Sequence, residues 1–155
     1  MVSQNIKKKI AILNAKNEMN KFSFLEFFEY EMDGSVWVSQ FEKTLKKFRS
    51  IDSTPLLNKE YGDSQSNNLK WIVDSLGYFK DKQELLILVP NILEPIWVNV
   101  KVISFEKSIE ELLTISQTNE FTIGDKSTGR IAQLFCEEEG YEIHTEVSYV
   151  DVENY

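Results

Sequence analysis

The sequence predicts an α+β protein in which N-terminal helices pack on a mainly antiparallel sheet of about five strands. Apolar residues recur at helical spacing up to about residue 80, and from Glu84 onward the period becomes that of strands. Helices followed by a run of strands are typical of this fold class. The 155 residues match the size of one domain, so we predict a single domain over 1–155, with a helical half, about 1–80, and a β-rich half, about 81–155.

A first helix is predicted close to the N-terminus. Ser3 is a suitable cap, and Ile6, Ile10 and Leu13 follow the i, i+4, i+7 spacing of a helix. The lysine run 7–9 projects from one turn of this helix, and we interpret it as a solvated helix face.

The segment 22–32 holds the densest aromatic cluster of the chain, and its mixed spacing leaves both a helix and a strand open. Core packing is the usual role of such a cluster. A second helix is expected on the apolar stripe Trp37, Phe41, Leu45 and Phe48. Ser39, with Glu42 three residues later, matches a capping box, which places the start of the regular helix there.

Residues 50–68 are predicted to form a loop, since Pro55, Gly62 and a polar Ser/Gln/Asn run interrupt any regular pattern. A third helix is expected from about Asn68 to Phe79. Its apolar face consists of Leu69, Ile72, Val73 and Leu76.

The β-rich half opens with the apolar run Leu85–Val89, which predicts a strand covered on both faces. A second strand is predicted over 96–102, with Ile96, Val98, Val100 and Val102 on its covered face and Trp97, Asn99 and Lys101 on the other. Ser108 is a suitable cap for a short helix to Ile115. Strands over 120–124 and 130–136 flank a hairpin loop at Asp125–Gly129.

The last predicted strand runs from Tyr141 to Val150 after a turn at Glu138–Gly140. Successive side chains of a strand point to opposite faces of its sheet. We expect one face to belong to the core: Tyr141, Ile143, Thr145, Val147 and Tyr149. The other face is expected to meet solvent: Glu142, His144, Glu146 and Ser148.

Residue types on which most enzyme mechanisms depend are scarce. The one cysteine, Cys136, and the one histidine, His144, are interpreted as a strand residue and a surface residue. The sequence contains no Gly-x-Ser-x-Gly elbow, no phosphate-binding glycine loop and too few His and Cys for a zinc site. We therefore predict a protein that is not an enzyme and that binds neither a metal nor an organic cofactor.

A cytoplasmic location is expected from three features. A single cysteine excludes an internal disulfide and fits a reducing compartment. The N-terminal segment lacks the apolar core of a signal peptide. The longest apolar run, Leu85–Pro90, is far shorter than the ~20 residues of a membrane helix, so no contact with a membrane is predicted.

Negative charge is concentrated in the second half of the chain. The formal net charge is −8. Residues 1–80 carry 12 Lys/Arg against 10 Asp/Glu, a net charge of +2, whereas residues 81–155 carry 5 against 15, a net charge of −10. Such a field repels nucleic acid and anionic membranes and attracts basic proteins. The alternative explanation is that the acidic surface serves solubility alone.

The β-rich half resembles small bacterial immunity proteins that accompany polymorphic toxins, including those of contact-dependent growth inhibition. The resemblance lies in the order of elements over about residues 84–146: ELLILVPNILEPIWVNVKV, SIEELLTIS, and EFTIGDKSTGRI leading into GYEIH. It implies a cytoplasmic inhibitor that occludes the active site or an exosite of a cognate toxin. Many toxins of this class are basic nucleases, which an acidic protein would suit.

The partner-binding surface is predicted on the outward face of the last strand and the turn before it. Alternating residues on a strand lie about 7 Å apart on one face. The predicted contact residues are Glu137, Glu138, Glu139, Glu142, His144, Glu146, Asp151 and Glu153. The leading hypothesis is a stoichiometric immunity protein. The alternatives are an acidic nucleic-acid mimic of phage type and, less favoured by the residues, a small α+β enzyme.

Overall fold

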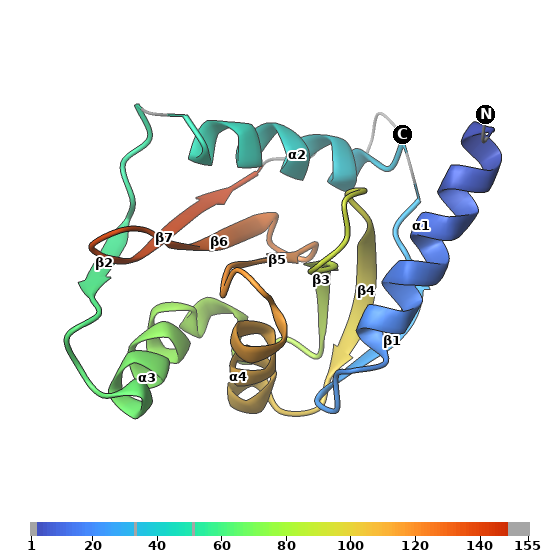
Figure 1. Cartoon of the computed structure of the whole chain (residues 1–155). Helices are drawn as coiled ribbons and strands as arrows, with labels where there is room; N and C mark the ends of the chain where they lie inside the picture. Colours follow the sequence, from blue (N-terminus) through green and yellow to red (C-terminus); the bar gives the residue numbers. More distant parts are fainter. Residues whose placement is uncertain (1–2, 33, 51, 149–155) are drawn as a thin grey trace.

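Seven strands form one antiparallel sheet in the order β1-β4-β3-β5-β6-β7-β2. The computed structural model describes residues 3–32, 34–50 and 52–148, and Figure 1 shows its layers. The strands are β1 (Leu25–Tyr30), β2 (Leu57–Glu60), β3 (Glu84–Leu88), β4 (Trp97–Val102), β5 (Phe121–Asp125), β6 (Arg130–Cys136) and β7 (Gly140–Val147).

Helices cover both faces of this sheet. They are α1 (Gln4–Met19), α2 (Val36–Phe48), α3 (Gln65–Ser75), the 3-10 turn η1 (Gly77–Phe79) and α4 (Phe105–Ile115). Helix α2 crosses one face, whereas α3 and α4 lie on the opposite face and α1 runs beside β1 (Figure 1). The molecule therefore has a layer of sheet between two layers of helix.

The structure confirms the α+β class and the antiparallel sheet, but the sheet has seven strands rather than five. The aromatic segment 22–32 contains β1, and the predicted loop 50–68 contains β2. These two strands form the edges of the sheet, so both halves of the sequence contribute to it. An edge strand has only one neighbour and a weaker burial pattern, which makes it hard to recognise from periodicity.

Two hydrophobic clusters hold the layers together. The larger one joins α1, α3 and α4 to one face of the sheet. The smaller one joins α2 to the other face and consists of Phe41, Leu45, Phe48, Leu86, Trp97 and Ile131. Because α2 covers this second face, β4 is buried on both sides, which corrects the predicted open face of Trp97 and Asn99. The indole of Trp97 also donates a hydrogen bond of 2.8 Å to the carboxylate of Glu42.

The starts of two helices differ from the prediction. Helix α2 is capped by Ser35, which accepts a hydrogen bond from the backbone of Trp37, and not by Ser39. Helix α4 is capped by Ser104. Ser108, the predicted cap, lies inside α4, where its buried hydroxyl donates to the carbonyl of Phe24. In both cases a serine one turn earlier satisfies the free N–H groups of the first turn.

Helix α1 has the predicted cap but buries a different face. Ser3 accepts a hydrogen bond from the backbone N–H of Ile6, as expected. The face that packs on the sheet carries Ala11, Ala15 and Met19. The predicted apolar stripe of Ile6, Ile10 and Leu13 points to solvent instead.

Candidate partner-binding surface

An acidic groove lies at the end of the sheet where β2 pairs with β7. It encloses about 300 Å³ and is lined by Pro55, Asn58, Lys59, Glu60, Glu137, Glu139, Gly140, Tyr141 and Glu142. Four of these side chains are carboxylates and one is an ammonium. That ammonium, on Lys59, lies 3.4 Å from the carboxylate of Asp63. The groove is therefore strongly negative.

The register of β2 and β7 brings these carboxylates together. Asn58 lies opposite Glu142 and Glu60 lies opposite Gly140, so the side chains of Glu60 and Glu142 project from the same face of the sheet. Gly140 is needed at this point, because a Cβ atom there would lie 2.1 Å from the carbonyl oxygen of Lys59. Any larger residue would push β2 away from β7 and open the groove.

The turn between β6 and β7 is fixed by several contacts. The backbone N–H of Glu137 donates to the carbonyl of Gly140 at 2.9 Å. The hydroxyl of Tyr61 donates to the carbonyl of Glu137, and its ring meets that of Tyr141 edge-on with centroids 4.8 Å apart. The carboxylates of the turn therefore project from an ordered backbone.

The predicted contact residues separate into two groups. Glu137, Glu138 and Glu139 are exposed in the turn, and Glu142 is half-buried beside them. Glu137, Glu139 and Glu142 share the acidic groove with Glu60, which the sequence interpretation missed because it placed 50–68 in a loop. Asp151 and Glu153 lie outside the described residues.

The other predicted residues of β7 do not form an open row. His144 is only 5% exposed, in contrast to the predicted solvent position, because α2 covers this face. Its ring packs on those of Phe48 and Phe135, with centroids 5.5 and 5.1 Å away. The carboxylate of Glu146 lies 3.5 Å from the ammonium of Lys47 on α2.

The end of β7 also departs from the predicted alternation. Ser148, expected in solvent, is buried and lies 3.0 Å from the hydroxyl of Thr44 on α2. Val147, expected in the core, is exposed. The face that was predicted to bind a partner is therefore largely the face on which α2 packs, and only its first residue, Glu142, reaches the acidic groove.

Ser53, His144 and Glu142 form a chain of polar contacts next to the acidic groove. His144 Nδ1 lies 3.0 Å from Ser53 Oγ, and His144 Nε2 lies 3.5 Å from Glu142 Oε1. A catalytic serine needs an open pocket and donors for an oxyanion. The acidic groove is lined by Glu142 but by neither Ser53 nor His144. We interpret the trio as a structural link that ties the segment after α2 to β7.

Cys136 lies at the end of β6, next to the acidic turn. Burial raises the pKa of its thiol to about 11, and the nearby carboxylate of Glu120 adds to this effect. The thiol donates to the carbonyl of Asn119, with a sulfur-oxygen distance of 3.2 Å.

The raised pKa predicts an unreactive cysteine. At pH 8 a thiol with this raised pKa contains far less thiolate than an ordinary thiol with a pKa of about 8.5. A thiolate of higher pKa is a better nucleophile, but this offsets only part of the loss in reaction rate. Alkylation of the folded protein by iodoacetamide should be about tenfold slower, or more, than alkylation of the protein unfolded in urea. Equal rates in both states, followed by mass spectrometry, would contradict the assignment.

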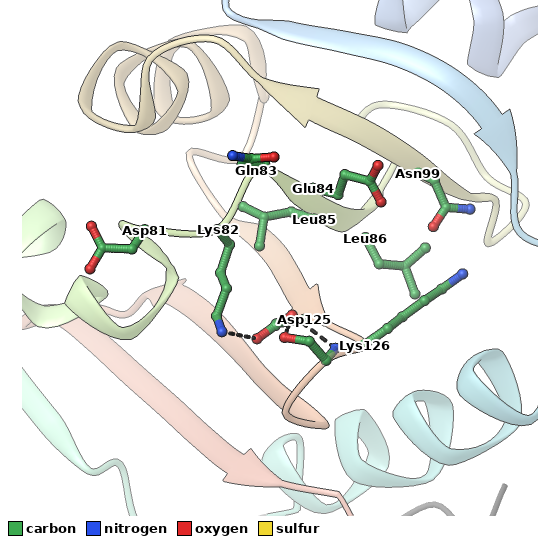
Figure 2. A pocket seen from close by; sticks show the side chains of 10 residues that line it. Asp81, Lys82, Gln83, Glu84, Leu85, Leu86, Asn99, Asp125 and Lys126 are labelled. Atoms are coloured by element: carbon green, nitrogen blue, oxygen red, sulfur yellow. Dashed lines mark hydrogen bonds and ion pairs between the residues drawn. The ribbon is translucent and has the colours of Figure 1, made fainter.

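A second concave region, the charged cleft, lies between β3, β4 and the β5–β6 hairpin (Figure 2). It encloses about 450 Å³. Three of its charged side chains form ion pairs. Lys82 points toward Asp125, with 3.5 Å between nitrogen and oxygen (Figure 2). Lys126 forms an ion pair with Glu31, which lies just after β1. These ion pairs form a structural network that attaches the β5–β6 hairpin to the rest of the sheet.

Asp125 is the centre of this network. Burial alone would raise the pKa of its carboxyl group, but hydrogen bonds from Thr128 and Ser127 and the charge of Lys82 outweigh burial and hold the pKa below its ordinary value. A carboxylate with a lowered pKa in the folded state stabilises the protein above its unfolded pKa, and this stabilisation is lost as the pH falls through the folded pKa.

Replacement of Asp125 by alanine should therefore lower the free energy of unfolding by roughly 2–3 kcal/mol at pH 7, since charged hydrogen bonds are lost in a buried place. The difference between the two proteins should shrink when the pH falls below about 3.8, the ordinary pKa of the group. Urea unfolding at pH 7 and pH 3 measures both quantities. A difference that does not change with pH would show that the carboxylate charge plays no part.

Comparison with known proteins leaves function to be inferred from these surfaces. No family model, no curated protein and no solved structure matches this chain. No helix within the described residues is long and apolar enough to cross a bilayer. Among the same residues, no group of three or more His, Cys, Asp or Glu side chains is placed to hold a metal ion.

Proposed function

We propose that the protein is an immunity protein that binds a cognate basic toxin in the cytoplasm and neutralises it by stoichiometric inhibition. The toxin class that fits best is a nuclease of a bacterial polymorphic toxin system, such as contact-dependent growth inhibition. The observation that carries the proposal is the acidic groove, where four glutamates surround a depression of about 300 Å³.

Electrostatics support a basic partner. The second half of the sequence has a net charge of −10, and the groove is built mainly from that half. A nuclease binds phosphate with Lys and Arg, and carboxylates pair with the same side chains through charge-assisted hydrogen bonds. A cluster of carboxylates at the rim of a nuclease site would therefore compete with the substrate for those residues.

Pre-organisation supports tight binding. The turn that carries Glu137 and Glu139 is closed by a backbone hydrogen bond and by the contact with Tyr61. A surface that is already ordered loses less conformational entropy when a partner binds. Rigid carboxylates thus retain more of the interaction free energy than carboxylates on a mobile loop.

The second candidate is an acidic mimic of nucleic acid that inhibits a nucleic-acid-binding machine. The same carboxylates favour it. A mimic presents charge along an extended surface, whereas here the four glutamates gather at one end of the sheet. The inhibition of a toxin is therefore preferred. The gene that lies next to this one separates the two candidates: a toxin gene supports the first and a phage locus the second.

The proposal predicts fast association that is sensitive to salt. Clustered charge steers a basic partner, and this attraction is screened beyond about 10 Å at 0.1 M salt. The association rate of the affinity-purified partner, measured by stopped flow, should fall at least about tenfold from low to high ionic strength. A rate that is indifferent to salt would mean that the negative charge serves solubility.

A further inference from the structure

A polar pocket lies at the end of the sheet where β3 stops and β5 starts. It encloses about 410 Å³. The side chain of Gln133 on β6 lines it and projects from the same face of the sheet as Ile131, on which α2 packs. We call this site the Gln133 pocket. Its lining consists of residues 88–93, 116–118, 120–122 and Gln133.

Gln133 is a buried amide whose oxygen lacks a hydrogen bond. The residue is only 6% exposed, and its Oε1 has no hydrogen-bond partner among the described residues. Its neighbours across the sheet are Thr122 of β5 and His144 of β7. The ring nitrogens of His144 face Ser53 and Glu142 instead. Burial of an amide oxygen without a donor is unfavourable, so a ligand that brings a donor would stabilise this position.

The Gln133 pocket is far larger than a single water molecule. One water takes up about 30 Å³ of the liquid, against about 410 Å³ for the pocket. Sites for small organic molecules enclose roughly 300–1,000 Å³. The terminal amide of a glutamine rotates easily about its last side-chain bond, so Oε1 can turn from its buried position toward this space. The pocket can therefore receive an organic group that donates to Gln133.

The other polar groups of the Gln133 pocket favour a cation. Glu120 is the only charged residue among the described residues that line it. Glu120 Oε2 accepts a hydrogen bond of 2.9 Å from the backbone N–H of Cys136, which holds the carboxylate in place. Glu120 precedes Thr122 by two residues, and Thr122 lies opposite Gln133. The two acceptors, Glu120 and Gln133, are therefore diagonal neighbours on two strands, about 7 Å apart.

We propose that the Gln133 pocket binds a guanidinium group on a short aliphatic stem. A guanidinium is flat, carries a fixed fork of N–H donors and has no acceptor. One edge would donate to the carboxylate of Glu120 and another to Gln133 Oε1. The stem would pack on Leu88 and Ile92, which line the same pocket. An ammonium group is a compact point charge, which suits acceptors on two strands less well.

Two sources can supply this group, namely an arginine side chain of a partner protein and a free small molecule. The net charge of −10 over residues 81–155 attracts either one. Among the described residues, the Gln133 pocket shares none of its lining with the acidic groove. The proposal therefore does not rest on the function proposed for that groove, and its test needs no toxin.

The test titrates the isotope-labelled full chain with n-butylguanidinium at millimolar concentrations and follows its amide signals by NMR. The largest shifts are expected at Thr122 and at the backbone and side-chain amides of Gln133, with saturation at one site. The control probe is n-butylurea, which has nearly the same shape but no charge. It should bind about tenfold more weakly, or less, because it cannot pair with the carboxylate of Glu120.

Two variants locate the contacts. Gln133→Leu removes the unpartnered oxygen at similar size, so it should weaken binding about tenfold or more and raise the thermal midpoint. Glu120→Gln removes the charge but keeps an oxygen for the N–H of Cys136, and it should weaken binding to a similar degree. The matched control is Glu138→Gln, which removes the same charge from the exposed turn and should bind as the wild type does.

A short peptide with one arginine between glycines separates the two sources. Shifts at the same residues would assign the pocket to an arginine side chain, whereas binding of n-butylguanidinium alone would assign it to a free small molecule. The proposal is overturned if n-butylguanidinium shifts no signal at the pocket, if n-butylurea binds as tightly, or if either variant binds as the wild type does. A lower thermal midpoint of Gln133→Leu would also overturn it, since the amide would then have a partner in the folded protein.

Discussion

Replacement of Glu137 and Glu139 by lysine is expected to weaken the complex with the partner about a hundredfold or more, because each change removes an attraction and adds a repulsion. Both residues are exposed in the turn between β6 and β7, and both line the acidic groove. The backbone contacts that close this turn do not involve their side chains. The thermal midpoint should therefore change little. Calorimetric titration of the purified partner gives the affinity, and circular dichroism gives the midpoint.

A matched control separates the site from the overall charge. Glu106 and Glu110 are exposed on α4, and their replacement by lysine makes the same change in net charge, from −8 to −4. Helix α4 lies away from β2 and the turn between β6 and β7 (Figure 1), whose residues line the acidic groove. The control variant should lose only the small part of the attraction that depends on the total charge of the protein. Equal weakening by both variants would mean that total charge, and not the groove, governs binding.

Phe41→Ala should lower the free energy of unfolding by about 3–5 kcal/mol, since it removes a large side chain from a closed core and leaves a cavity. Phe41, on the sheet-facing side of α2, is fully buried and meets the rings of Trp37 and Trp97 at centroid distances of 5.7 and 5.9 Å. The contact attaches α2 to the sheet. Urea unfolding measures the loss. Phe28→Ala, at a partly exposed phenylalanine of β1, is the control and should cost much less.

Gly124 gives this prediction a second test. A Cβ atom at Gly124 would lie 2.6 Å from Cε2 of Phe41, so Gly124→Ala alone should destabilise the protein by roughly 1–3 kcal/mol through overpacking. In the double variant the added methyl group enters the space that Phe41 has left. Its loss of stability should be smaller than the sum of the two single losses by more than about 0.5 kcal/mol. Additive losses would contradict the packing of Phe41 on Gly124.

Strong local patterns predicted most of the regular structure. The apolar run of β3, the alternation of β4 and the turn residues between β5 and β6 predicted the presence of these strands. The burial of β4 on both faces did not follow from its alternation, because α2 covers the second face. Strand β2 was missed because its four residues, LNKE, have almost no alternation in burial at the edge of the sheet. Glu60 was missed with it, since only the pairing of β2 with β7 brings that carboxylate to the groove.

The side of a strand or helix that a distant element covers is harder to predict. Alternation in β7 divides its side chains into two sets, but it is the contact with Phe48 of α2 that buries His144. Helix α2 precedes β7 by about a hundred residues, and no local pattern encodes that contact. In α1 the helical stripe was recognised, yet the small side chains of Ala11 and Ala15 allow the closer approach to the sheet. The larger Ile6, Ile10 and Leu13 remain outside.

The most direct test of the proposed function is a comparison of proteins captured by three tagged forms of the chain from the organism that produces it. The forms are the wild type, the variant with lysine at 137 and 139, and the control with lysine at 106 and 110. We expect one basic protein that the wild type and the control hold in a 1:1 ratio and that the 137/139 variant does not capture. The nuclease activity of this captured protein should fall when the wild-type chain is added. A partner that is acidic, or that all three forms retain equally, would contradict the proposed function.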